Sequence, residues 1–198
     1  MNNNKNNFIV NAPKDGTEYE SNSYIIVDGM IEGEVSGENL IGGTVSTPLI
    51  RADNVEISNY KDVVTPTIKE VTFDSLSIDQ YGYTVEINKI EYAENETRLY
   101  VTLKNNGQST FYFYDFNMKI TQDGKQYDGG TSYEADYPVI QAELLPGSES
   151  SGVVVFPAID QSKGFDIYAE GSSDNWEEEF QQYKYRITVE HKYFVYAK

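Results

Sequence analysis

The most constraining feature of this sequence is a strict two-residue alternation of apolar and polar side chains over residues 98–104. Leu99, Val101 and Leu103 are apolar, and polar or amphipathic residues separate them. A period of two places successive side chains on opposite faces of a strand, one of which is buried. Asn105-Asn106-Gly107 follows directly and is typical of a turn, because Asn and Gly tolerate positive φ. The segment therefore predicts a half-buried strand that ends in a tight turn.

Short segments of the same kind recur to the end of the chain, separated by turn residues such as Asp123-Gly124 and Leu145-Pro146-Gly147. We expect strands over residues 70–78, 83–92, 98–104, 111–121, 152–156, 165–170, 183–190 and 192–197. Residues 174–182 are expected to form a short helix or an acidic loop. This spacing of strands and turns predicts an all-β fold, an immunoglobulin-like β-sandwich over residues 67–198.

The alternation also predicts which side chains fill the sandwich. The expected core residues are Leu99, Val101, Leu103, Phe116, Met118, Val153 and Val155. Along residues 111–121, one face would carry Tyr112, Tyr114, Phe116, Met118 and Ile120, and the opposite face Phe111 and Phe113. We expect one of these faces in the core and the other beneath the N-terminal segment, which disfavours an exposed aromatic row for sugar stacking.

The N-terminal residues differ from the rest of the chain. Residues 1–7 are polar and predict a disordered leader. Over residues 8–66, long or branched apolar residues recur every five positions among clustered glycines, at Val35, Leu40, Val45, Ile50 and Val55. That spacing predicts short strands with frequent turns. It is compatible with a β-hairpin assembly that adds strands to the next unit. It is also compatible with a short β-solenoid, because residues 28–37 weakly resemble rungs of bacterial polymer-forming β-helical proteins.

The boundary between the two parts is predicted at Val63-Val64-Thr65-Pro66, because a residue that precedes proline is forced into an extended conformation. A segment of about 60 residues buries little surface alone. Its apolar runs at residues 8–10 and 24–27 are nevertheless too apolar for a linker. We therefore expect residues 8–66 to dock on the sandwich.

Several of these turns and strands occur in the order found in a known bacterial family. They are Arg98 to Gly107, Asp123-Gly124, Leu145-Pro146-Gly147 and Ser151 to Phe156. The series resembles immunoglobulin-like domains of unknown function in Gram-positive lipoproteins, similar in fold to a mycobacterial secreted immunoprotective antigen. The resemblance covers about residues 68–170. It implies an extracytoplasmic, usually lipid-anchored protein, although residues 1–66 lie outside it and the chain has no lipobox cysteine.

Charge and composition exclude several functions. The formal net charge is −17, so the chain repels nucleic-acid phosphates and anionic membrane surfaces. Cysteine is absent, which excludes disulfides and thiolate sites. His191 is the single histidine and is expected in a turn. The stretch from Gly147 to Gly152 misses the Gly-x-Ser-x-Gly elbow, and residues 123–128 miss the calcium-loop pattern. Trp176, which acidic residues flank, is expected to cap the core. We therefore expect no enzyme activity, cofactor or metal.

The expected location follows from the resemblance and from the start of the chain. Residues 1–10 lack the apolar region of a signal peptide, and no stretch reaches the roughly 20 apolar residues of a membrane span. Either the protein is cytoplasmic, or an export signal and a lipid anchor precede residue 1. The resemblance favours an extracellular or cell-surface protein, with no membrane insertion by this chain.

The predicted function is a non-enzymatic surface module that binds an unknown protein or cell-wall component. A carbohydrate-binding module of the cell envelope and an assembly protein built through the N-terminal segment are the alternatives. Loops carry recognition on sandwich folds. The candidate loop spans residues 129–138, where Tyr133 and Tyr137 alternate with Glu134 and Asp136. Tyrosines offer contact area at low entropic cost, and the acids would select a basic or hydroxyl-rich partner. The competing interpretation is that these tyrosines lie across the end of the sandwich.

Overall fold

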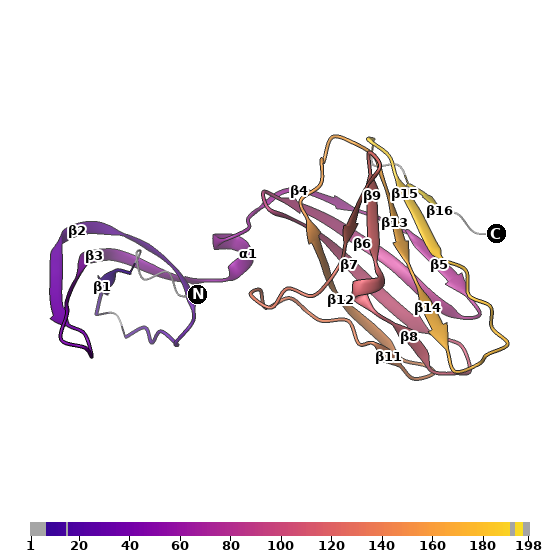
Figure 1. Cartoon of the computed structure of the whole chain (residues 1–198), viewed down its shortest axis with the longest axis horizontal. Coiled ribbons are helices and arrows are strands. Elements are labelled where there is room, and N and C mark those ends of the chain that lie inside the picture. Colours follow the sequence, from indigo (N-terminus) through magenta and orange to yellow (C-terminus); the bar gives the residue numbers. More distant parts are fainter. Residues whose placement is uncertain (1–6, 15, 191–192, 196–198) are drawn as a thin grey trace. The chain divides into compact units, whose positions relative to one another are not determined.

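A computed structural model describes residues 7–14, 16–190 and 193–195 (Figure 1). The chain forms two compact units, Met1–Val63 and Val64–Lys198. None of the helices in the described ranges has both the length and the apolar character needed to cross a membrane. His191, which was expected in a turn, lies outside the described residues.

The N-terminal unit is built on one long β-hairpin. Strands β2 (Tyr24–Glu38) and β3 (Thr44–Ser58) pair antiparallel, and the short β1 (Ile9–Asn11) pairs parallel to β3. The single-turn helix α1 (Tyr60–Val63) follows. The expectation of short strands was wrong, and so was the solenoid, because each long strand has fifteen residues. A hairpin is present, but among the described residues its strands form a sheet of their own, β1-β3-β2, and do not add to a sheet of the next unit as that alternative expected.

Two β-bulges explain why the apolar spacing misled. The register shifts between Asp28 and Gly29 and again between Ile31 and Gly33. A Cβ on Gly29 would collide with the carbonyl of Arg51, and Gly33 has a φ of +153°. These glycines therefore mark bulges inside long strands, which break the period of two without ending the strand.

The register gives this hairpin one apolar face. Cross-strand partners occupy the same face of a sheet, and three pairs are apolar on both strands: Ile25 with Ile57, Val27 with Val55, and Ile31 with Ile50. Most of these side chains are exposed: Ile57 by 59% and Ile31 by 70%. Among the described apolar residues of this unit, Ala52 alone is buried. The N-terminal unit thus has almost no core of its own.

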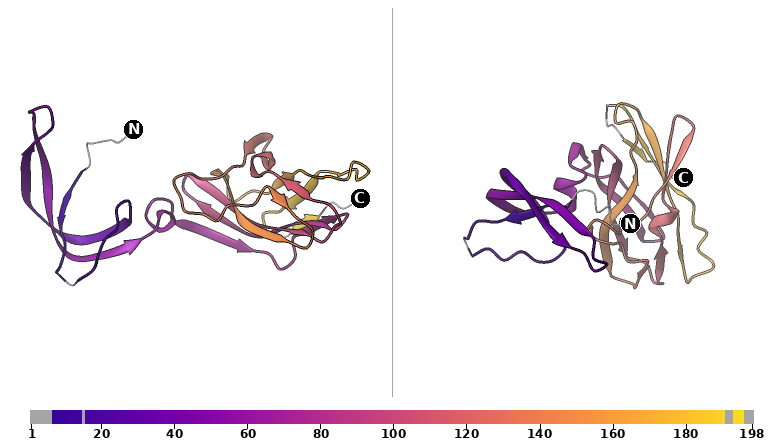
Figure 2. Two further views of the ribbon diagram at one scale, coloured as in Figure 1. Left: turned by 90° about the horizontal axis from the view of Figure 1, so that it is seen from below. Right: turned by 60° about the vertical axis from the view of Figure 1, so that its left-hand side comes forward.

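The second unit is an all-β sandwich (Figures 1 and 2). One sheet has the order β12-β7-β6-β4, and β5 also pairs with β6. Its strands are β4 (Thr67–Thr72), β5 (Ser77–Gln80), β6 (Tyr83–Ala93), β7 (Glu96–Asn105) and β12 (Glu149–Pro157). All of these pairs are antiparallel. The predicted all-β fold is therefore confirmed.

The facing layer consists of a five-stranded sheet with the order β10-β9-β13-β15-β16 and a three-stranded sheet with the order β11-β8-β14. The strands of the first are β9 (Lys119–Gln122), β10 (Lys125–Asp128), β13 (Phe165–Ala169), β15 (Tyr183–Ile187) and β16 (Tyr193–Val195). The strands of the second are β8 (Phe111–Phe113), β11 (Glu143–Leu144) and β14 (Gly171–Ser173). A 3₁₀ turn, η2 (Asp115–Asn117), separates β8 from β9.

Apolar side chains and two tyrosine hydroxyls join the layers. Tyr185 Oη donates to the carbonyl of Val85 at 2.6 Å, and Tyr183 Oη donates to the carbonyl of Tyr83 at 3.1 Å. Burial raises the pKa of Tyr185 well above its usual value. Of the expected core, Leu99, Val101, Leu103 and Met118 belong to the hydrophobic core; Val153 is also buried, but on the face of β12 opposite to the core residue Val154. The strand predicted over residues 98–104 is β7, extended at both ends.

Two core assignments were wrong because the alternation changes phase. Phe116 is 58% exposed, whereas Phe111 and Phe113 are buried. The expected strand over residues 111–121 is interrupted by η2, whose three residues per turn move the following side chains to the other face. Val155 is only half-buried, and Val154 occupies the core instead. In an unbroken run of valines, the sequence does not indicate which residues face the core.

The turns largely follow the expected chemistry. Asp123 and Gly124 have φ values of +51° and +75° and close the β9–β10 hairpin, and Gly147 has a φ of +79°. Gly107 is different, because a Cβ there would lie 2.6 Å from Tyr83 Cζ. Close approach to a buried ring, rather than positive φ, requires this glycine.

Candidate functional site

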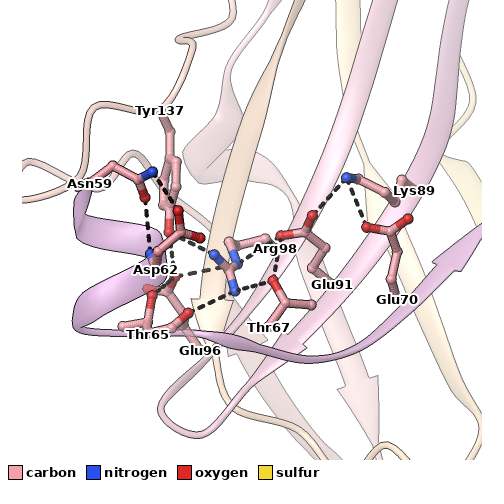
Figure 3. Close-up of polar contacts among 10 residues, drawn as sticks. All are labelled: Asn59, Asp62, Thr65, Thr67, Glu70, Lys89, Glu91, Glu96, Arg98 and Tyr137. Atoms are coloured by element: carbon pink, nitrogen blue, oxygen red, sulfur yellow. Dashed lines mark hydrogen bonds and ion pairs between the residues drawn. The ribbon is translucent and has the colours of Figure 1, made fainter. Parts of the chain in front are cut away.

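A group of buried and half-buried charged side chains in the sandwich surrounds Arg98 (Figure 3). Arg98 and Glu96 lie on β7, and Glu91 lies on the neighbouring β6. The side chains of Arg98 and Glu91 have no exposed surface, and that of Glu96 is 10% exposed. Arg98 Nε lies 3.4 Å from Glu91 Oε2 and 3.5 Å from Glu96 Oε1, which are ion-pair distances. Buried charges of this kind are tolerated only when they are paired and hydrogen-bonded.

Arg98 Nε itself has no hydrogen-bond partner among the described residues, whereas the two Nη nitrogens donate to two other segments. Nη2 donates to the carbonyl of Thr65 at 3.0 Å and to Thr67 Oγ1 at 3.2 Å. Nη1 donates to Tyr137 Oη at 3.0 Å. Tyr137 Oη in turn donates to Glu96 Oε1 at 2.8 Å. The guanidinium fork therefore joins β4, β7 and the loop of residues 129–138.

A lysine extends the group toward the sheet surface. Lys89 Nζ donates to Glu91 Oε1 at 2.6 Å and to Glu70 Oε2 at 3.1 Å. Burial opposes the charge of Lys89, but these two hydrogen bonds outweigh it and raise its pKa. Both oxygens of Glu91 are thus occupied, one by Lys89 and the other by Thr67 and Arg98. We name these residues the Arg98 cluster: Thr65, Thr67, Glu70, Lys89, Glu91, Glu96, Arg98 and Tyr137.

The Arg98 cluster connects β4, β6, β7 and the loop of residues 129–138. Its charged groups are committed to one another. The sequence analysis did not predict this cluster. Arg98 and Tyr100 alternate with the apolar residues of the strand, so Arg98 was expected to face outward like Tyr100. The available signal was Glu96, which is two residues from Arg98 on the same strand and therefore shares its face.

The Arg98 cluster fixes one end of the predicted binding loop. Tyr137 is half-buried, its hydroxyl is bonded within the cluster, and its ring centroid lies 5.7 Å from Arg98 Cζ. Burial raises the pKa of Tyr137, and its hydrogen bond to Glu96 acts in the same direction. Of the four predicted site residues, Tyr137 is thus an anchor. The other three, Tyr133, Glu134 and Asp136, are exposed, Tyr133 by 98%.

The other end of the loop is fixed by the backbone. Gly130 and Val155 exchange two N–H to O hydrogen bonds of 3.0 and 2.8 Å. Thr131 Oγ1 donates to Asp115 Oδ2 at 2.5 Å, which connects the loop to η2. The exposed tip, residues 132–136, lies between these contacts and Tyr137. Its Ser132 Oγ accepts from Ala135 N at 3.2 Å.

A shallow hollow of about 430 Å³ lies at the base of this loop. Its lining includes Glu96, Asp128, Thr131, Ser132 and Phe156. Hydrogen bonds from Lys119 and Gln126 lower the pKa of Asp128, so this carboxylate is charged at neutral pH. The hollow and the tip therefore present acidic and hydroxyl groups side by side.

The other positions considered from sequence have ordinary surroundings. Among the described residues, no group of three or more His, Cys, Asp or Glu could hold a metal ion. Asp123 and Asp128 pair with Lys163 at 2.6 Å and Lys119 at 3.0 Å. Trp176 is 87% exposed, so the expectation that it caps the core was wrong. Residues 174–182 are irregular, and Phe180 packs against the core instead.

Comparison with known proteins places this all-β sandwich in a family. The family described as "Domain of unknown function (DUF4352)" matches residues 69–174, and the chain belongs to it. The crystal structure of a functionally unknown protein from Listeria monocytogenes EGD-e is similar at 13% identity with a TM-score of 0.45. That match covers 52% of this chain and 75% of the other.

A second solved structure, the yjhA protein from Bacillus subtilis, is similar at 13% identity with a TM-score of 0.43, covering 60% of this chain and 93% of the other. No protein with a curated description matches the chain.

Proposed function

We propose that this chain is a non-enzymatic module that works outside the cytoplasm and binds its partner with the loop of residues 129–138. The observation that supports this most is the contrast between the loop's ends and its tip. Tyr137 and Gly130 are held by hydrogen bonds to the sandwich, whereas Tyr133 is almost fully exposed. Ends that are ordered in advance lower the entropic cost of binding.

The chemistry of the tip suggests the kind of partner. Tyr133 provides an apolar ring with a polar hydroxyl, and Glu134 and Asp136 add two carboxylates beside it. Asp128 lines the hollow at the loop's base. Such a surface suits a basic or hydroxyl-rich protein or cell-wall component. A carbohydrate of the cell envelope is the second candidate, because the ring of Tyr133 is free to stack on a sugar.

The proposed location rests on the resemblance to Gram-positive lipoproteins rather than on the fold. It is tested by the reading frame that precedes residue 1 and by cell fractionation. An export signal with a lipobox cysteine, and recovery of the protein with the envelope, would support the proposal. Recovery in the cytoplasmic fraction would contradict it.

The binding proposal is tested by capture from cell-wall extract with the purified chain as bait. The test variant is Tyr133→Ala/Glu134→Gln, which changes the tip and leaves both anchors intact. Trp176→Ala is the control, because it removes another largely exposed aromatic ring from a different loop. We expect partners to be lost with the tip variant and retained with the control. Identical partner profiles for the wild type and a folded tip variant would refute the proposal.

A further inference from the structure

A second aromatic surface lies on the outside of the sandwich. Tyr112, Tyr114 and Phe116, which we name the aromatic strip, run along β8 and into η2. Tyr114 is 41% exposed and Phe116 is 58% exposed. Their ring centroids lie 5.3 Å apart with an interplanar angle of 29°, so the two rings are stacked. Single exposed aromatics are common, but a stacked pair beside a third ring forms an apolar patch.

The aromatic strip faces outward because its residues alternate with the buried residues of β8. Phe111 and Phe113 take the core positions of β8, so Tyr112 faces outward. In an unbroken strand Met118 would share this outward face, but η2 shifts the alternation, so Met118 is buried while Phe116 remains 58% exposed. Folding does not require three neighbouring aromatics at an outer position, so their presence there calls for another explanation.

Carboxylates border the aromatic strip. Tyr112 Oη donates to Asp174 Oδ1 at 2.9 Å, and Glu143 is the cross-strand partner of Tyr112 on β11. The hydrogen bond to Asp174 raises the pKa of Tyr112, and the charges of Asp174 and Glu143 act in the same direction. The basic side chain beside Phe116 is Lys119, which is paired with Asp128 at 3.0 Å. The surroundings of the strip are therefore acidic, as is the whole chain at −17.

The ring geometry distinguishes between two kinds of ligand. A sugar ring stacks on an open, flat aromatic face, and several such faces must be coplanar to bind a chain of sugars. Tyr114 and Phe116 instead turn one face of each ring toward the other. A cation needs only one remaining ring face within about 6 Å, and nearby carboxylates strengthen its attraction. Rings and charges together favour a cationic ligand.

We propose that the aromatic strip binds a basic segment of a partner protein, with Lys or Arg side chains placed over Tyr114 and Phe116 and beside Asp174 and Glu143. The positive charge of the partner follows from the acidic border. The aromatic rings add cation–π contacts to the binding energy, which charge attraction alone would not provide. The strip is distinct from the tip of the loop of residues 129–138, so this proposal does not depend on Tyr133.

The proposal is tested by titrating the full chain into fluorescently labelled octa-arginine at physiological salt and following anisotropy. A neutral Gly-Ser peptide of equal length and a chitin oligosaccharide serve as alternative probes. Tyr114→Ala/Phe116→Ala should weaken octa-arginine binding by about fivefold or more, because both cation–π contacts are lost. Tyr114→Phe/Phe116→Tyr keeps both ring faces and should bind like the wild type. Tyr133→Ala should also bind normally, which separates this test from that of the loop.

Non-specific attraction to a chain of charge −17 is the main competing explanation, and the variants resolve it. None of them changes the net charge, so equal binding by wild type and Tyr114→Ala/Phe116→Ala would overturn the proposal. Binding of the chitin oligosaccharide that depends on the same two rings would also overturn it, in favour of a carbohydrate surface. Circular dichroism checks that each variant is folded, and the ring-preserving double variant controls for loss of structure.

Discussion

Replacing Arg98 by methionine tests the central claim about the Arg98 cluster. The substitution removes three hydrogen bonds, to Tyr137, to Thr65 and to Thr67, and two ion pairs. It leaves two buried carboxylates without their shared cation. Removing one partner of a buried ion pair costs about 3–5 kcal/mol, because the remaining charge stays desolvated. That is a large share of the roughly 5–15 kcal/mol that stabilises a typical domain.

The free energy of unfolding is measured by urea titration with far-ultraviolet circular dichroism. Fluorescence is a poor probe here, because Trp176 is largely exposed in the folded state. Lys163→Met is the control, since Lys163 pairs with Asp123 and Asp160 at the surface. Exposed ion pairs contribute about 0–1 kcal/mol. Arg98→Lys should fall between the two, because an ammonium group keeps the charge but lacks the planar fork.

The Arg98→Met result decides between two interpretations of the cluster. A loss below about 1 kcal/mol, with an unchanged dependence on urea, would show that water or local rearrangement compensates the carboxylates. The cluster would then contribute little to the stability of the sandwich. A loss of the predicted size that Glu96→Gln partly restores in the double variant would instead confirm the coupling between these side chains.

Three further outcomes are expected. Tyr92→Phe should be neutral or stabilising at pH 7, because the buried Tyr92 hydroxyl has no hydrogen-bond partner among the described residues. Tyr185→Phe should instead lower the free energy of unfolding by about 1 kcal/mol, because it loses the hydrogen bond to the carbonyl of Val85. Burial raises the pKa of Tyr92 from 10.0 to about 12, so the unfolded chain loses this proton first as pH rises. Stability should fall between pH 10 and 12 by about 1.4 kcal/mol per pH unit for this group, and a urea titration series should show a smaller fall for Tyr92→Phe. Removing residues 1–63 should lower the melting temperature of the sandwich or cause aggregation, because we propose that the apolar hairpin face docks on it; an equally stable monomer would contradict this.

The strands that could be predicted are those whose two faces differ. Residues 98–104 alternate without interruption, and the Asp123-Gly124 turn ends its strand with residues that adopt positive φ. The valine run at residues 153–155 could not be assigned a phase, since either face satisfies an apolar pattern. The η2 turn could not be predicted, because its three residues are too few to show a helical spacing of apolar residues.

The candidate site could be predicted from the sequence only in part, for a different reason. The exposed tip of the loop followed from its composition. The role of Tyr137 did not, because its partners Glu96 and Arg98 are 41 and 39 positions away in the sequence. The N-terminal hairpin was misjudged because bulges at Gly29 and Gly33 imitate turns. In each case a tertiary contact or a register shift overrode the local pattern.

The two fixed ends of the loop of residues 129–138 have a consequence for how such a module can change. Gly130 is held through its backbone, and Thr131 and Tyr137 are bonded outside the tip. Within the described part of the chain, the hydrogen bonds that secure the loop do not involve the side chains of residues 133, 134 or 136. These positions can therefore diverge, or be replaced in a designed library, without loss of the scaffold. One sandwich can in this way acquire new partners by exchanging a few surface residues while its interior remains constant.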